Sequence, residues 1–278
     1  MSFIVRNMKP SEMKIAVNWA AKEGWNPGLT DGEVFYNTDP EGFFVAELGG
    51  EIIGVKSAVN YNDEFGFMGF YIIKDEFRGK GYGLELWQHA FNRIKRICSG
   101  MDGVVEQQHN YMKSGYKLFY RQMRYEAKNI VGMEHSQVLN FEQKYFGEIV
   151  DYDEAVFPSR REKFLDLWLN QKFISAKVFL EDDKLKGYGV IRKCHKGFKI
   201  GPLFADDYKT AKALFLSLAN YADGEEVYLD IPEVNSEANN LVKNFGMQYV
   251  FETARMYNNG SPKTGTEKVF GVTTFELG

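Results

Sequence analysis

A glycine-rich stretch is the part of the sequence best suited to bind an anion. It follows an apolar segment, precedes an amphipathic one, and reads Arg78-Gly79-Lys80-Gly81-Tyr82-Gly83. Glycines let a ligand approach the backbone closely because they have no Cβ. Successive N–H groups at the start of a helix attract a phosphate or pyrophosphate, and Arg78 and Lys80 add positive charge. We therefore expect residues 78–83 to bind a ligand that carries phosphate groups.

Two common nucleotide-binding motifs do not fit this stretch. A Walker loop needs the pattern G-x₄-G-K-[ST], which residues 78–83 lack. A dinucleotide-binding loop needs its glycines early in a strand–helix–strand unit, with an acidic residue after the next strand. Here an expected hairpin and a further strand come before the glycines, so this alternative fails on its context.

Two motifs resemble those of the Gcn5-related N-acetyltransferase (GNAT) family. Arg78, Gly81 and Gly83 match its R/Q-x-x-G-x-G/A signature, and Tyr111, Gly115 and Tyr116 match the end of its fourth helix. The resemblance covers residues 3–125 and implies acetyl-CoA or another acyl-CoA as cosubstrate, without a metal. It assigns acyl-CoA binding to the fourth strand and the glycine-rich loop, at Phe70, Tyr71, Ile72, Ile73, Arg78, Gly79, Lys80, Gly81, Tyr82 and Gly83.

The same resemblance suggests groups for the chemistry. Tyr111 is the candidate acid for the leaving thiolate, because a phenol with a pKa of ~10 is reasonably matched to a thiol of ~8.5. A packing role on its helix is the alternative. Glu64 and Glu23 are the candidate bases, although a chain of water molecules could also deprotonate the amine. Trp25 and Asn26 lie in a loop that lines the acceptor site in the family.

These residues need a set of short elements to position them. Apolar residues at helical spacing and two apolar runs around Gly49-Gly50 predict helices and a hairpin in the first half. The expected elements are a strand at 3–5, helices at 13–20 and 31–37, a hairpin at 43–55, a strand at 65–73, a helix at 84–94, a short strand at 104–105, a helix at 108–114 and a strand at 118–125.

The second half repeats this plan. Three anchors recur 131 residues later: Asp75-Glu76-Phe77 at Asp206-Asp207-Tyr208, Gly115 at Gly246, and Arg124 at Arg255. A common spacing of this kind indicates an internal repeat. We predict a catalytic domain at 1–128, a linker at 129–142 and a second domain at 143–278 that ends in a further strand. Arg124 and Arg255 are expected to form architectural ion pairs.

The second half has lost the candidate site. The stretch that corresponds to the glycine-rich loop lacks glycine, and Val242 replaces the tyrosine. The fold class expected from all of this is α/β (α+β), with two tandem GNAT-like domains. In each, helices flank a mixed, mostly antiparallel, twisted sheet. Only the first domain is expected to bind acyl-CoA productively.

Composition limits the classes of function. The formal charge is −4 at pH 7, so a nucleic acid is not expected as a partner. No apolar run approaches a membrane span, and the first residues lack a signal-peptide core, so we expect a cytoplasmic protein that does not bind membranes. The two cysteines lack disulfide or metal spacing, and the four histidines lack zinc-site spacing. Either a monomer or a homodimer is compatible with the sequence.

The sequence thus predicts an acyl-CoA-dependent N-acyltransferase that transfers an acetyl group to a primary amine of a small molecule or amino acid. A non-catalytic acyl-CoA sensor and a protein lysine or N-terminal acetyltransferase are the alternatives.

Overall fold

The computed structural model describes residues 2–262 and 264–278, which form two successive sets of elements in the same order. The first set is β1 (Phe3–Asn7), α1 (Met13–Lys22), α2 (Asp31–Thr38), β2 (Phe43–Leu48), β3 (Glu51–Asn60), β4 (Phe65–Ile73), α3 (Tyr82–Ile94), β5 (Cys98–Val104), α4 (Gln108–Lys113) and β6 (Lys117–Ala127). The second set is β7 (Val138–Asn140), α5 (Phe146–Glu154), α6 (Glu162–Leu169), β8 (Ile174–Glu181), β9 (Lys184–Lys193), β10 (Phe198–Ala205), α7 (Tyr208–Ala219), β11 (Val227–Pro232), α8 (Ser236–Asn244) and β12 (Gln248–Asn258), followed by β13 (Val269–Gly271). The tandem repeat and the mixed sheet flanked by helices are confirmed.

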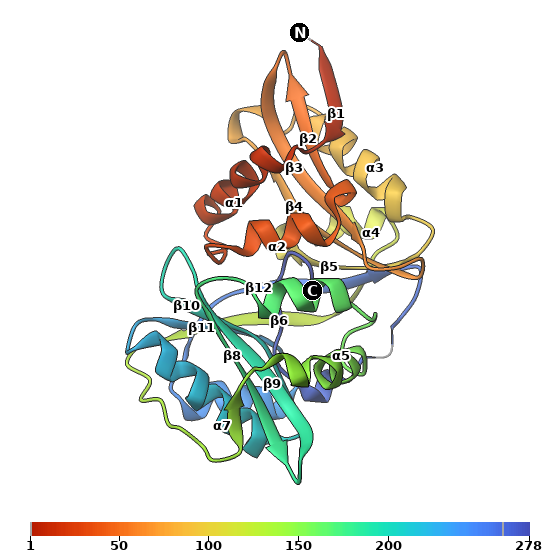
Figure 1. Ribbon diagram of the computed structural model, residues 1–278. Coiled ribbons are helices and arrows are strands. Elements are labelled where there is room, and N and C mark those ends of the chain that lie inside the picture. Colours follow the sequence, from red (N-terminus) through yellow and green to blue (C-terminus); the bar gives the residue numbers. More distant parts are fainter. Residues whose placement is uncertain (1, 263) are drawn as a thin grey trace.

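The two halves exchange their last strands within one continuous sheet. The strand order is β1-β2-β3-β4-β5-β12-β6-β11-β10-β9-β8-β7, with β13 beside β10. β12 therefore completes the sheet of the first half, and β6 completes the sheet of the second (Figure 1). The boundary expected at residue 128 follows the order of the chain, whereas the sheet mixes the two halves at its centre.

A buried ion pair holds each exchanged strand. Arg124 on β6 lies opposite Asp230 on β11, with Nε to Oδ1 at 2.6 Å, and both side chains are almost fully buried. Arg255 on β12 makes the equivalent pair with Asp102 on β5, at 2.7 Å. Each arginine thus bonds to an aspartate of the other half, and the expected architectural role of both arginines is confirmed.

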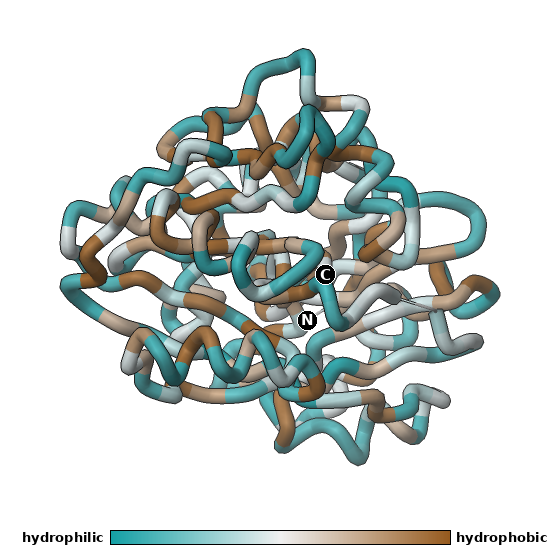
Figure 2. The backbone as a smooth tube through the Cα atoms, turned by 90° about the horizontal axis from the view of Figure 1, so that it is seen from below, coloured by the Kyte–Doolittle hydropathy of each residue, from teal (hydrophilic) through white to brown (hydrophobic). Residues whose placement is uncertain are grey.

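Three large hydrophobic cores lie between the layers, besides a small cluster around Phe67. One lies between the sheet of the first half and α3, and another between the sheet of the second half and α7 and α8. The third joins α1 and α2 to α5 and α6, where Phe35 stacks on Trp168 with ring centroids 6.1 Å apart. Figure 2 shows hydrophilic stretches on the peripheral loops of this arrangement. The packing of α1 and α2 against α5 and α6 therefore holds the two halves in contact.

The structure differs from the expected elements in four places. A single helix was expected at 159–170, whereas α5 (Phe146–Glu154) precedes the helix found there. β5 begins at Cys98, well before the expected position at 104, because small residues and Met101 form a buried strand without a long apolar run. The segment expected to be a linker contains β7, which pairs with β8. The final strand is confined to Val269–Gly271. Among the described residues, no helix is both long and apolar enough to cross a membrane.

Candidate functional site

β4 and β5 separate in the middle of the first half. They pair in parallel from Phe65 opposite Cys98 to Met68 opposite Met101, and the pairing ends there. Just beyond this point β4 bulges: Phe70 and Tyr71 together face the single residue Lys56 on β3, and Phe70 adopts a φ of 47°. A bulge leaves a residue out of the regular ladder and redirects the strand. The separation therefore opens the sheet beside the bulge.

A small cavity of about 50 Å³ lies in this opening. We call it the central cavity. The first half contributes Trp25, Lys56, Met68, Gly69, Phe70, Tyr71, Met101, Asp102, Gly103, Val104 and Tyr111. The exchanged strand β12 and the last residues contribute Phe251, Thr253, Phe275 and Glu276. Met101 and Tyr111 belong to the core beneath α3, and Phe70 to the core beneath α1 and α2, so the cavity is reached by side chains from both faces of the sheet.

The glycine-rich loop lies between the end of β4 and the start of α3. Gly79 and Gly81 adopt φ angles of 73° and 90°, and a Cβ at either position would meet open space. Glycine is needed here for the backbone conformation, because residues with a Cβ avoid positive φ. The loop is exposed, and α3 is long enough for its first N–H groups to attract an anion.

Arg78 anchors this loop to the end of β4 and to the segment after α1. Its Nε donates to the carbonyl oxygen of Ile73 at 2.8 Å, and its guanidinium pairs with Glu23 at 2.6 Å and Asp75 at 2.9 Å. The carboxylate of Glu23, a candidate base, is therefore engaged by the loop and does not line the central cavity. Ile72 and Ile73 line a separate depression beside Glu23 and Arg78.

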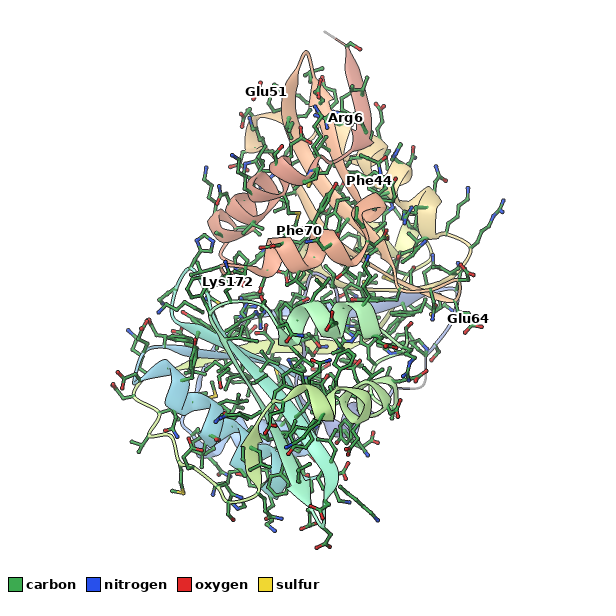
Figure 3. All side chains as sticks on the ribbon, in the orientation of Figure 1. Arg6, Phe44, Glu51, Glu64, Phe70 and Lys172 are labelled. Carbon is green, nitrogen blue, oxygen red and sulfur yellow. The ribbon has the colours of Figure 1, made fainter. Side chains whose placement is uncertain are left out.

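The other sequence candidates take different positions. Tyr111 is buried, stacks on Trp87 with centroids 5.2 Å apart, and lines the central cavity. Burial raises the pKa of its hydroxyl well above the ordinary value. Trp25 also lines the cavity, whereas the side chain of Asn26 is bound to the backbone of Lys196 at 2.8 and 2.9 Å. Glu64 lies in an exposed turn at the edge of the molecule, far from Phe70 (Figure 3).

Most residues of the cavity were not expected from the sequence, and two of these, Lys56 and Glu276, are titratable groups that could take part in the chemistry. Lys56 follows the apolar run Ile52–Val55 in β3 and is the one lysine of that strand, which was the available signal. Glu276 comes from the segment after β13, which passes between the two halves, and the last residues lie there in Figure 1. A Cβ on Gly69 would lie 2.2 Å from the Glu276 carbonyl oxygen, so the segment touches the β4 bulge. Burial raises the pKa of the Glu276 carboxyl, against the opposing charges of Lys199 and Arg124.

The corresponding opening in the second half is closed by the chain itself. β10 and β11 pair in parallel from Phe198 to Ile200 and then separate in the same way. β13 pairs with β10 beyond that point, and Val272 N–H donates to the Asp230 carbonyl oxygen at 2.8 Å. The start of α7 is also occupied, because the Asp207 carboxylate accepts from the Thr210 N–H at 2.8 Å. The places that correspond to the central cavity and to the start of α3 are therefore filled by the chain.

The site is open in the first half and closed in the second, so the two halves should differ in ligand binding. We expect one acetyl-CoA to bind per chain, and Gly81→Val to weaken that binding at least about tenfold, since a β-branched residue cannot hold the φ of Gly81 without strain. Isothermal titration calorimetry measures both quantities. The matched change at the equivalent position of the second half, Lys212→Val, is expected to alter neither. Two bound molecules per chain, or equal weakening by both variants, would contradict the assignment.

No cluster of three or more His, Cys, Asp or Glu side chains is placed to hold a metal ion within residues 2–262 and 264–278. The candidate site consists of the central cavity and the loop that precedes α3.

Comparisons with known proteins find one acetyltransferase domain in each half of the chain. The model of the acetyltransferase (GNAT) family matches residues 13–115, and that of an acetyltransferase (GNAT) domain matches residues 149–271. A holothin acyltransferase from a Pseudoalteromonas strain is 32% identical over 274 residues, which cover 96% of this chain and 92% of the relative.

Solved structures show the same fold over the whole length. A putative acetyltransferase from Pyrococcus horikoshii has a TM-score of 0.84 at 21% identity, covering 99% of this chain and 96% of its own. A tandem GNAT protein from the clavulanic acid biosynthesis pathway has a TM-score of 0.65 at 11% identity, covering 94% of this chain and 100% of its own. The chain belongs to the GNAT acetyltransferase family as a protein with two such domains in tandem, and it is an acyltransferase.

Proposed function

We propose that the first domain, residues 1–128 completed by β12, transfers an acetyl group from acetyl-CoA to a primary amine of a small molecule or amino acid. The amine attacks the thioester directly. The observation that carries this proposal is the central cavity, which opens at the β4 bulge and is lined by Lys56, Tyr111 and Glu276. Tyr71 of the bulge also lies against Gly83 of the glycine-rich loop. An amine and a thioester that met there would have titratable groups near both the leaving and the attacking atoms.

The donor part of the site uses the residues expected from the sequence. Residues 78–83 at the start of α3 would hold the pyrophosphate through backbone N–H groups. Backbone N–H groups of residues 70–73 would stabilise the oxyanion, as fixed dipoles do in acyl transfer. The bulge supports this role because Phe70 and Tyr71 lie beyond the last residue of β4 that pairs with β5.

The acceptor part uses residues from the whole length of the chain. Trp25, Phe251 and Phe275 give the cavity apolar walls, and Thr253 Oγ1 is buried with no hydrogen-bond partner among the described residues. We assign Glu276 to bind the amine and accept its proton. Glu23 and Glu64 could act as bases only through water, since neither lines the cavity. Asn26 would act indirectly, by fixing the loop that carries Trp25.

The test is a panel of acceptors with acetyl-CoA, followed by release of the CoA thiol and by mass spectrometry of the product. The panel includes holothin, because the relative that is 32% identical is named for it, as well as amino acids, simple primary amines and a lysine peptide. Steady thiol release with a small amine supports the proposal. Tight binding of acetyl-CoA without any thiol release would identify a sensor, and turnover of the peptide alone a protein acetyltransferase.

Tyr111→Phe tests the acid that the sequence suggested. Since burial raises its pKa, the Tyr111 hydroxyl holds its proton more firmly than the CoA thiol does. We therefore expect Tyr111→Phe to lower kcat by less than about tenfold, below the usual range for removing a general acid. A loss of several hundredfold in steady-state turnover would restore Tyr111 as the acid.

A further inference from the structure

Lys56 presents a buried amino group to the central cavity. It lies on β3 opposite the β4 bulge, and its side chain is almost fully buried. Its Nζ has no hydrogen-bond partner among the described residues, and lies 4.5 Å from the Trp87 ring centroid and 5.0 Å from that of Tyr71. Leaving a buried polar group unpaired is costly, and aromatic faces compensate only in part.

The fold itself does not require a lysine at this position. In the second half, β10 bulges in the same way, with Gly201 and Pro202 opposite a single residue of β9. That residue is Val190, which is fully buried in the core. The half whose opening is closed by β13 therefore has an apolar side chain where the half with the cavity has Lys56. The bulge can therefore form without a lysine, and the amino group of Lys56 is found only where the cavity is open.

The environment of Lys56 sets its protonation. Burial lowers its pKa to about 7, and no carboxylate counteracts this effect. The titratable groups around it are the phenols of Tyr71 and Tyr111, both with raised pKa values. Of the two cavity carboxylates, Asp102 is bonded to Arg255, and Glu276 comes from the segment after β13. Lys56 therefore has both a protonated and a neutral form near pH 7.

Acyl transfer would produce a thiolate, which is a hydrogen-bonding and charge partner of the kind that the Lys56 amino group lacks. When the C–S bond of the thioester breaks, the sulfur leaves with the electron pair and needs a proton. A buried ammonium that shares the cavity with Tyr111 is suited to supply it. We propose, on the basis of the proposed function, that Lys56 is the general acid that protonates the sulfur of CoA, while Tyr111 orients that sulfur.

The full step is balanced as follows. The amine nitrogen forms a bond to the carbonyl carbon and passes one proton to Glu276. The C–S bond breaks, and the sulfur takes a proton from the Lys56 ammonium. The products are the amide, the CoA thiol, a neutral Lys56 and a protonated Glu276. Solvent returns the proton from Glu276 to Lys56 before the next cycle.

The first experiment needs no turnover. CoA is bound to the wild-type protein and to Lys56→Met, and the ultraviolet absorbance of the thiolate is titrated with pH. We expect a lower thiol pKa in the wild-type complex than in the Lys56→Met complex, because the ammonium stabilises the thiolate. Lys113→Met, which removes an exposed charge two residues from Tyr111, is the matched control and should match wild type. Equal thiol pKa values in wild type and Lys56→Met would overturn the proposal, whereas absence of CoA binding by wild type would contradict the proposed function instead.

The second experiment measures kcat with saturating acetyl-CoA. Lys56→Met is expected to lower kcat by about 100-fold or more, with acetyl-CoA affinity changed only a few-fold. Because the acid must be protonated, wild-type kcat falls as pH rises through the pKa of Lys56, and this alkaline limb disappears in Lys56→Met. The variant should unfold at a temperature no lower than wild type, since it removes an unpaired buried amine. Retained kcat or an unchanged alkaline limb in Lys56→Met would each overturn the proposal.

Discussion

Arg124→Ala is expected to lower the free energy of unfolding by about 3–5 kcal/mol, because it leaves Asp230 buried without its partner. Arg124 also donates to the Trp25 carbonyl oxygen at 2.6 Å and lies over the rings of Phe251 and Phe275, at 4.8 and 5.0 Å. A single side chain thus joins β6, β11, β12 and the cavity wall. Urea denaturation followed by circular dichroism measures the change.

The effect of Arg124→Ala depends on pH in a defined direction. In the wild type, burial raises the pKa of Asp230 but Arg124 lowers it further, so its net pKa is depressed. Asp230 therefore contributes stability above its unfolded pKa, and this contribution is lost as pH falls through the depressed value. In the variant the lowering by Arg124 is lost, and although Lys199 and Arg192 still lower the pKa of Asp230, it is higher than in the wild type because burial raises it. The stability difference from wild type should therefore narrow as pH falls from 7 toward 5.

Two comparisons separate this effect from a general loss of an arginine. Arg124→Met combined with Asp230→Leu removes both charges and should be less destabilised than Arg124→Ala. Arg160→Ala removes an exposed arginine that pairs with Asp151 and Glu154, and should leave the unfolding transition unchanged within error. If Arg124→Ala behaves like Arg160→Ala, the exchanged strand does not depend on the buried pair.

Glu276→Gln is expected to reduce kcat/KM for the acceptor amine by about 100-fold or more, the usual range for removing a general base. The substitution keeps the shape of the side chain and removes its ability to accept a proton. Because burial raises the pKa of Glu276, the wild-type rate should rise with pH through this raised value as the carboxylate forms. That acidic limb should be absent from the pH profile of Glu276→Gln. Affinity for acetyl-CoA should be unchanged in calorimetry.

The two glutamates suggested by the sequence serve as comparators in the same assay. Glu64→Gln changes an exposed turn, and Glu23→Gln breaks the ion pair with Arg78. If either lowered kcat/KM more than Glu276→Gln does, or if Glu276→Gln kept its acidic limb, Glu276 would not be the base.

The sequence was informative wherever local spacing determines structure. The glycines at 79 and 81 are needed for a backbone conformation, and the helix that follows them has a clear apolar face. The matched Arg124 and Arg255 were recognisable because a repeated element keeps its buried charges. These features depend on neighbours in the chain, so motifs and periodicity could reveal them.

The exchange of β6 and β12 could not be predicted in this way. The pattern of apolar and polar residues in β6 and β12 would be the same without the exchange. Each strand occupies, in the sheet of the other half, the position it would otherwise occupy in its own. Glu276 was missed for a related reason, since no spacing rule connects position 276 to the bulge at Phe70. Lys56 was detectable as a charged residue directly after the apolar run Ile52–Val55, but only the bulge and the cavity showed that it was more than a surface lysine.

The exchanged strands also impose an order on folding during synthesis. β5 pairs with β4 but acquires its second neighbour only when β12 has been made, roughly 150 residues and about 8–30 s later at ordinary rates of translation. Until then the first half has an unpaired sheet edge, and β6 has no partner until β11 emerges. Such edges are sites of aggregation. The nascent chain therefore depends on chaperones or rapid completion in a way that two independently folding domains would not.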